Sequence, residues 1–181
     1  ESLIRFAPLV AEARRLGIKV RGYLSTVIAC PYDGPTRPKR VAALAERLLD
    51  LGCHEISLGD TIGIGTPGTV APMLDAVLHE VPAGRLAVHF HDTYGQGLAN
   101  LLPALERGIR TIDCSVAGLG GCPYAPGASG NVASEEVVYL LHGLGMSTGV
   151  NLDRLAATGQ WVSELLGRPN GSRVGQALHA R

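Results

Sequence analysis

Two histidines stand at the end of an apolar run in residues 86–96, LAVHFHDTYGQ. Successive side chains of a strand point to opposite faces, so His89 and His91 share one face, about 7 Å apart along the strand. Two imidazoles followed directly by Asp92 are typical of a divalent-metal site or an acid–base site. A pair of structural histidines that cap the strand through hydrogen bonds is the alternative, and the pair alone does not decide between them.

Three other residues could contribute to the same chemistry, and each has a structural alternative. Asn131 offers a side-chain oxygen for a metal, or it caps the helix that follows. Cys122 lies between Gly121 and Pro123, where a nearby cation would lower its thiol pKa; otherwise it is an ordinary buried thiol. Asp60 follows an apolar run and could bind substrate or relay a proton, or it could be a turn carboxylate.

Alternating strands and helices must position these residues. Hydrophobic spacing predicts strands near residues 20–29, 54–58, 86–91 and 109–117, separated by amphipathic helices. This order predicts parallel βαβ units. Four units match half of a (β/α)₈ barrel. An open doubly wound sheet is the alternative, but it usually carries phosphate-binding glycines after its first strand, and none are present there.

The loops that follow parallel strands share one rim, where catalysis occurs in barrels. The candidate residues all follow predicted strands, so we expect them to gather on that rim, which favours the functional interpretation of the histidines. We expect residues 1–181 to form a single domain, with 151–181 as a C-terminal helix and a polar, fraying tail.

Composition excludes several classes of protein. The chain has 16 basic and 16 acidic residues and no long run of either sign, so nothing supports a nucleic-acid or membrane surface. No apolar run approaches the 18 or so residues of a transmembrane helix. Four cysteines without a C-x-x-C pair favour free thiols. Richness in alanine, arginine and glycine suggests a bacterial, cytoplasmic protein; a eukaryotic source would suggest the mitochondrion.

Four motifs resemble those of the 3-hydroxy-3-methylglutaryl-CoA lyase family, in the family's order. They are residues 55–63 (EISLGDTIG), 89–96 (HFHDTYGQ), 115–124 (SVAGLGGCPY) and 128–131 (ASGN). The cysteine loop 115–124 is the most specific of them, and the resemblance runs from about Tyr23 to Asn151. Related barrel synthases share the histidine pair and the asparagine but do not typically share this loop.

The resemblance implies a (β/α)₈ barrel that cleaves hydroxymethylglutaryl-CoA to acetyl-CoA and acetoacetate. It implies that Mg²⁺ or Mn²⁺ is bound by His89, His91 and Asn131. It further implies Cys122, His89 and Asp60 as catalytic residues. Asp60, Thr61, Gly120 and Gly121 are the expected substrate-binding residues. An acyl-CoA substrate and a homodimer or higher oligomer complete these expectations.

One departure from the family pattern concerns the first barrel strand. The family carries an Arg-Asp-Gly motif there, and this chain contains none. The chain therefore resembles the C-terminal half of the enzyme, and we predict that it is incomplete as a catalyst, with unpaired strand edges. An aldol-type synthase of the same fold and a non-catalytic metal-binding fragment are the rival hypotheses.

Overall fold

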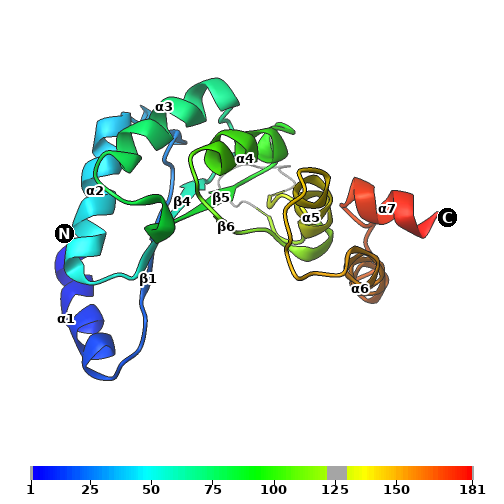
Figure 1. The fold of residues 1–181 in the computed structure, drawn as a ribbon, viewed down its shortest axis with the longest axis horizontal. Coiled ribbons are helices and arrows are strands. Elements are labelled where there is room, and N and C mark those ends of the chain that lie inside the picture. Colours follow the sequence, from blue (N-terminus) through cyan, green and yellow to red (C-terminus); the bar gives the residue numbers. More distant parts are fainter. Residues whose placement is uncertain (1, 122–129, 181) are drawn as a thin grey trace.

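The fold alternates strands and helices along the chain. The computed structural model describes residues 2–121 and 130–180 (Figure 1). The helices are α1 (Ser2–Arg15), α2 (Pro38–Leu51), α3 (Pro67–Leu78), α4 (Gly97–Glu106), α5 (Ser134–Gly143), α6 (Leu152–Leu165) and α7 (Arg173–His179), with 3-10 turns η1 (Ala83–Arg85) and η2 (Val116–Gly118). The strands are β1 (Arg21–Leu24), β2 (Ala29–Cys30), β3 (Gly34–Pro35), β4 (Glu55–Asp60), β5 (Leu86–Phe90) and β6 (Thr111–Ile112).

A four-stranded parallel sheet forms the centre, in the order β1-β4-β5-β6. Each strand lies beside the next one along the chain, and α2, α3 and α4 make the three crossovers. Figure 1 shows these three helices in an arc along one side of the sheet. Sequential strand order with helices on one side is the arrangement of half a (β/α)₈ barrel, as predicted, and is not that of a doubly wound sheet.

The two faces of the sheet differ in polarity because side chains alternate along each strand. On β4, Ile56 and Leu58 are completely buried on the helix side. Glu55 and Ser57 point to the other face, toward the barrel interior. The apolar face packs against buried side chains of the three crossover helices: Val41, Ala45, Leu48, Val70, Met73, Leu74, Val77, Leu101 and Ala104.

Two strands are shorter than predicted because the backbone turns. The strand predicted over 20–29 pairs with β4 only at residues 21–24, and Thr26 then adopts a positive φ of 58°. The strand predicted over 109–117 pairs with β5 only at residues 111–112, and Ala117 has a φ of 53°. Non-glycine residues seldom adopt this left-handed conformation, which strand periodicity does not reveal.

The C-terminal segment differs from the predicted fraying tail. Residues 173–179 form α7, whose first turn is capped by Ser172: the Ser172 Oγ accepts a hydrogen bond from the Gly175 N–H at 2.8 Å. Glu136 of α5 accepts hydrogen bonds from the Ser172 hydroxyl at 3.0 Å and the Arg173 N–H at 2.6 Å. These contacts from a distant helix hold α7 in place. None of the helices in the described ranges has the length and apolar content needed to cross a bilayer.

Candidate metal and catalytic site

The rings of the two histidines approach each other through their Nε2 atoms. The His89 Nε2 and His91 Nε2 atoms are 3.2 Å apart, and the ring centroids are 5.0 Å apart at an interplanar angle of 62°. Two nitrogens held at ~2.1 Å from one ion, at right angles, are about 3 Å apart. The observed spacing therefore fits two neighbouring ligands of a single cation.

Asn131 lies beside this pair although it is forty residues further along the chain. It forms an isolated antiparallel bridge with His91, and the Asp92 N–H donates to the Gly130 carbonyl at 2.7 Å. The Asn131 Nδ2 donates to the Leu119 carbonyl at 2.9 Å, which fixes the orientation of the amide. Its Oδ1 is buried and accepts no hydrogen bond from the described residues. An orphaned buried oxygen of this kind suits a cation.

The expected site includes no carboxylate ligand from the described residues. Within residues 2–121 and 130–180, no group of three or more His, Cys, Asp or Glu side chains could hold a metal. The ligand set that the chain offers is therefore two imidazoles and one amide. Such a set fits a divalent ion only in part, because Mg²⁺ and Mn²⁺ prefer several oxygen ligands.

Gly120 and Gly130 allow close approaches beside Asn131 that a side chain would block. Gly120 has a φ of 121°, and a Cβ there would lie 2.5 Å from the Asn131 Nδ2. Gly130 has a φ of 82°, and a Cβ there would lie 3.0 Å from the Gly121 nitrogen. Gly120 and Gly121, predicted to bind substrate, are exposed next to Asn131 and bring the loop ends together. Cys122 lies outside the described residues.

Asp60 and Thr61 lie on the next strand end, but the Asp60 carboxylate is engaged elsewhere. Asp60 is completely buried, and its Oδ2 accepts the Gly65 N–H at 2.7 Å. By strand alternation its side chain leaves β4 on the face opposite to Glu55 and Ser57. The Oδ2 contact is that of a turn carboxylate, whereas the Asp60 Oδ1 is buried without a hydrogen bond from the described residues, and burial raises the pKa of this carboxyl. The Thr61 hydroxyl accepts the Thr26 N–H at 2.8 Å, so it joins the loops after β1 and β4.

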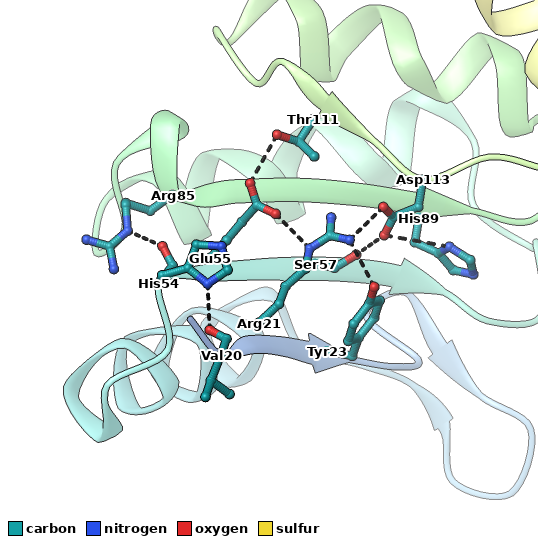
Figure 2. Close-up of polar contacts among 10 residues, drawn as sticks. All are labelled: Val20, Arg21, Tyr23, His54, Glu55, Ser57, Arg85, His89, Thr111 and Asp113. Carbon is teal, nitrogen blue, oxygen red and sulfur yellow. Dashed lines mark hydrogen bonds and ion pairs between the residues drawn. The ribbon is translucent and has the colours of Figure 1, made fainter. Parts of the chain in front are cut away.

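Sequence reasoning missed a charged network beneath the histidines (Figure 2). The Arg21 Nη1 donates to the Asp113 Oδ1 at 2.8 Å, and the Arg21 Nε lies 2.6 Å from the Glu55 Oε2. The Ser57 hydroxyl donates to the Asp113 Oδ2 at 2.7 Å, and that oxygen lies 3.9 Å from the His89 Nδ1. The available signal was the alternation of Glu55 and Ser57 with apolar residues.

A cleft of about 590 Å³ opens next to Asn131, between α4, α5 and the segment before α7. Apolar side chains of α4 and α5 line it together with two arginines that the sequence did not single out. The lining includes Asp92, Leu98, Leu102, Leu140, Arg168 and Arg173. The lining also includes Glu136, so two arginines and two carboxylates stand beside its apolar side chains.

Burial sets the protonation of the histidine pair. Burial lowers the pKa of His89, the Arg21 charge lowers it further, and Asp113 partly opposes both. Burial also lowers the pKa of His91, together with the neighbouring His89, against an opposing contribution from the Thr61 backbone. Both imidazoles are therefore neutral near pH 7 and available as ligands.

These shifts predict a pH dependence of stability. Because both pKa values are lower in the folded chain, the unfolded chain binds more protons once the pH falls below about 6.5. We expect the free energy of unfolding in EDTA to fall between pH 7 and pH 5, and to fall less in a His89→Gln/His91→Gln variant. Urea titrations at several pH values measure this. Equal pH slopes for the two proteins would contradict the prediction.

Comparison with known proteins places this geometry in a family. The HMGL-like family model matches residues 1–162. The chain is 59% identical over 181 residues to the mitochondrial hydroxymethylglutaryl-CoA lyase of Arabidopsis thaliana, covering 100% of this chain and 39% of the relative. It is 55% identical to the 3-hydroxy-3-isohexenylglutaryl-CoA/hydroxy-methylglutaryl-CoA lyase of Pseudomonas aeruginosa, covering 100% of this chain and 60% of the relative.

A solved structure confirms the fold. The crystal structure of hydroxymethylglutaryl-CoA lyase from Pseudomonas aeruginosa superposes with a TM-score of 0.96 at 55% identity, over 99% of this chain and 60% of that one. The chain thus spans between about two fifths and three fifths of the length of these relatives. With the family model matching 162 of its 181 residues, the chain belongs to the HMGL-like family.

Proposed function

We propose that this chain supplies the metal-binding part of a lyase that cleaves 3-hydroxy-3-methylglutaryl-CoA to acetyl-CoA and acetoacetate. One observation carries the proposal: the two Nε2 atoms of His89 and His91 meet at 3.2 Å beside the orphaned Asn131 oxygen. Relatives named as lyases of this substrate match the whole chain, which supports the choice of reaction.

We propose Mg²⁺ or Mn²⁺ as the ion held by His89, His91 and Asn131. When bound, a divalent ion would acidify the tertiary hydroxyl of the substrate and orient its carboxylate. Two imidazoles and one amide leave positions open for substrate oxygens and for ligands outside the described set.

Residues of this chain would then transfer the protons that the cleavage requires. Cleavage requires that the hydroxyl lose its proton while the carbon–carbon bond breaks, which leaves the enolate of acetyl-CoA. We propose that His89, neutral because burial lowers its pKa, takes part in accepting that proton. Cys122, which lies outside the described residues, would protonate or shield the enolate. Asp60 would take part in catalysis, and Asp60, Thr61, Gly120 and Gly121 would bind the substrate.

The cleft beside Asn131 fits the proposed acyl-CoA substrate. Arg168 and Arg173 offer positive charge for phosphate groups, and Leu98, Leu102 and Leu140 offer an apolar wall for a chain of methylenes. The Pseudomonas aeruginosa relative is named for a longer acyl group as well. We therefore propose an acyl-CoA with a 3-hydroxyglutaryl core, and hydroxymethylglutaryl-CoA as its first member.

The remaining expectations also stay proposals. We propose a homodimer or higher oligomer that interacts with neither nucleic acid nor membrane, in the bacterial cytoplasm or, in a eukaryote, the mitochondrion. We keep an aldol-type synthase as the rival enzyme, since it would use the same histidines and asparagine. The relatives named as lyases favour cleavage over condensation.

A chimera tests the proposed function. The part of the Pseudomonas aeruginosa lyase outside the matched region is fused ahead of residue 1, and turnover is measured with Mn²⁺ and hydroxymethylglutaryl-CoA. We expect stoichiometric acetyl-CoA and acetoacetate from the chimera, and no turnover from the 181-residue chain or from the Pseudomonas segment alone.

Other outcomes separate the rivals. A chimera that binds Mn²⁺ but releases no acetoacetate would support a non-catalytic metal-binding protein. Condensation of acetyl-CoA with a 2-oxo acid, without cleavage, would support the synthase. Near-normal turnover by the 181-residue chain alone would overturn the prediction that it is an incomplete catalyst.

A further inference from the structure

We propose that Asp113 is a positioning residue that fixes the ring of His89 with its proton on Nδ1. This leaves the lone pair of Nε2 facing His91. The inference rests on the metal site of the proposed function and adds to it the group that prepares His89 as a ligand.

The Asp113 carboxylate is itself held from two other strands. The Arg21 guanidinium of β1 donates to its Oδ1 at 2.8 Å, and the Ser57 hydroxyl of β4 donates to its Oδ2 at 2.7 Å. The Asp113 N–H donates to the Val88 carbonyl of β5 at 2.8 Å, so the backbone is fixed as well. An ionised carboxylate can only accept hydrogen bonds, so a hydrogen bond between Asp113 and His89 requires the proton on the His89 ring.

The Asp113 Oδ2 lies 3.9 Å from the Nδ1 of His89. The nitrogen is buried and makes no hydrogen bond with the described residues. At 3.9 Å the two atoms are within ion-pair range but beyond a hydrogen bond, so a small rotation of the imidazole would bring them together. Buried polar groups normally find such a partner.

The spacing of the ring nitrogens makes the position of the proton decisive. With the two Nε2 atoms 3.2 Å apart and no ion between them, one ring donates a proton to the other. Holding a cation requires a free lone pair on both Nε2 atoms, so each ring must carry its proton on Nδ1. A carboxylate facing Nδ1 stabilises that tautomer, as it does for metal-bound histidines generally.

Glu55 provides a matched comparison within the same network. Figure 2 shows Glu55 and Asp113 on opposite sides of the Arg21 guanidinium, with His89 on the Asp113 side. Glu55 contacts Arg21 at 2.6 Å and accepts the Thr111 hydroxyl at 3.0 Å, and no hydrogen bond or ion pair joins it to His89 among the described residues. Neutralising either carboxylate removes one negative charge beside Arg21. Of the two carboxylates, Asp113 is the one that faces His89.

The experiment compares Asp113→Asn with Glu55→Gln in the 181-residue chain. An amide at position 113 can present an N–H to His89, which stabilises the tautomer protonated on Nε2. We expect the Kd for Mn²⁺, followed by electron paramagnetic resonance, to weaken about 10–100-fold in Asp113→Asn. We expect the Kd of Glu55→Gln for Mn²⁺ to stay close to that of the parent chain. Long-range ¹H–¹⁵N NMR without added metal should show the parent His89 protonated on Nδ1 and His91 as the donor between the two rings.

Each result decides the question. Equal Mn²⁺ affinity of Asp113→Asn and the parent overturns the role of Asp113 and leaves the metal site intact. A parent chain that binds no Mn²⁺ overturns the metal site and this inference with it. If Asp113→Asn does not fold, the metal-free parent spectrum decides: a His89 proton on Nδ1 supports the proposal, and one on Nε2 overturns it.

Discussion

Replacement of His89 or His91 by alanine in the chimera is expected to lower kcat/KM for hydroxymethylglutaryl-CoA by about a thousandfold or more. Each substitution removes one of the two nitrogens that meet at 3.2 Å. The electrostatic contribution of a catalytic cation is several kcal/mol, and each 1.36 kcal/mol corresponds to a factor of ten in rate. Steady-state release of acetyl-CoA measures the loss, and Mn²⁺ titration should show weaker binding in parallel.

His54→Ala is the control for this prediction. His54 lies just before β4, at the end of the sheet away from the site, and its Nδ1 lies 2.7 Å from the Val20 carbonyl (Figure 2). We expect this variant to keep the metal affinity and activity of the parent chimera. Retention of both properties in His89→Ala and His91→Ala would mean that the pair caps the strand, the alternative left open by the sequence.

Replacement of Cys122 by alanine is expected to lower kcat of the chimera by about 10²–10⁴-fold, the range for loss of a general acid–base group. The Kd for Mn²⁺ should not change, because the thiol is not among the proposed ligands. Measuring kcat and the metal affinity on the same preparations separates the two roles.

Cys30→Ala is the matched control for the cysteine. Cys30 is a free thiol in β2, in the loop that follows β1 on the same rim. We expect Cys30→Ala to retain the activity of the parent. A chimera that turns over normally with alanine at position 122 would remove the thiol from the mechanism and weaken the likeness to the lyases at its most specific motif.

The fold class and the shared face of the histidines could be predicted from the sequence. Alternating strand and helix patterns predict parallel strands joined by helical crossovers, and the structure has the sequential order β1-β4-β5-β6 of the predicted half barrel. A strand has a period of two, so His89 and His91 had to lie on one face. The cap at the start of α6 also follows from local chemistry, since asparagine is a favoured cap residue and the Asn151 Oδ1 accepts the Arg154 N–H at 2.9 Å.

Where the strands end was not accessible from periodicity. Thr26 and Ala117 leave their strands through left-handed backbone conformations that their side chains do not favour. Contacts from outside each segment stabilise these turns: the Thr61 hydroxyl accepts from the Thr26 N–H, and the Glu135 carboxylate accepts from the Ala117 N–H at 3.0 Å. The cap that Glu136 supplies to α7 is of the same kind.

The sequence by itself determined which residue types could form the site, namely two histidines on one strand face and an asparagine that follows the cysteine loop. Only the tertiary structure decided that Asn131 pairs with His91, and that Arg21 reaches Asp113 across 92 residues of sequence. The physical reason is register, since a shift of one residue between neighbouring strands would turn each of these side chains to the other face of the sheet.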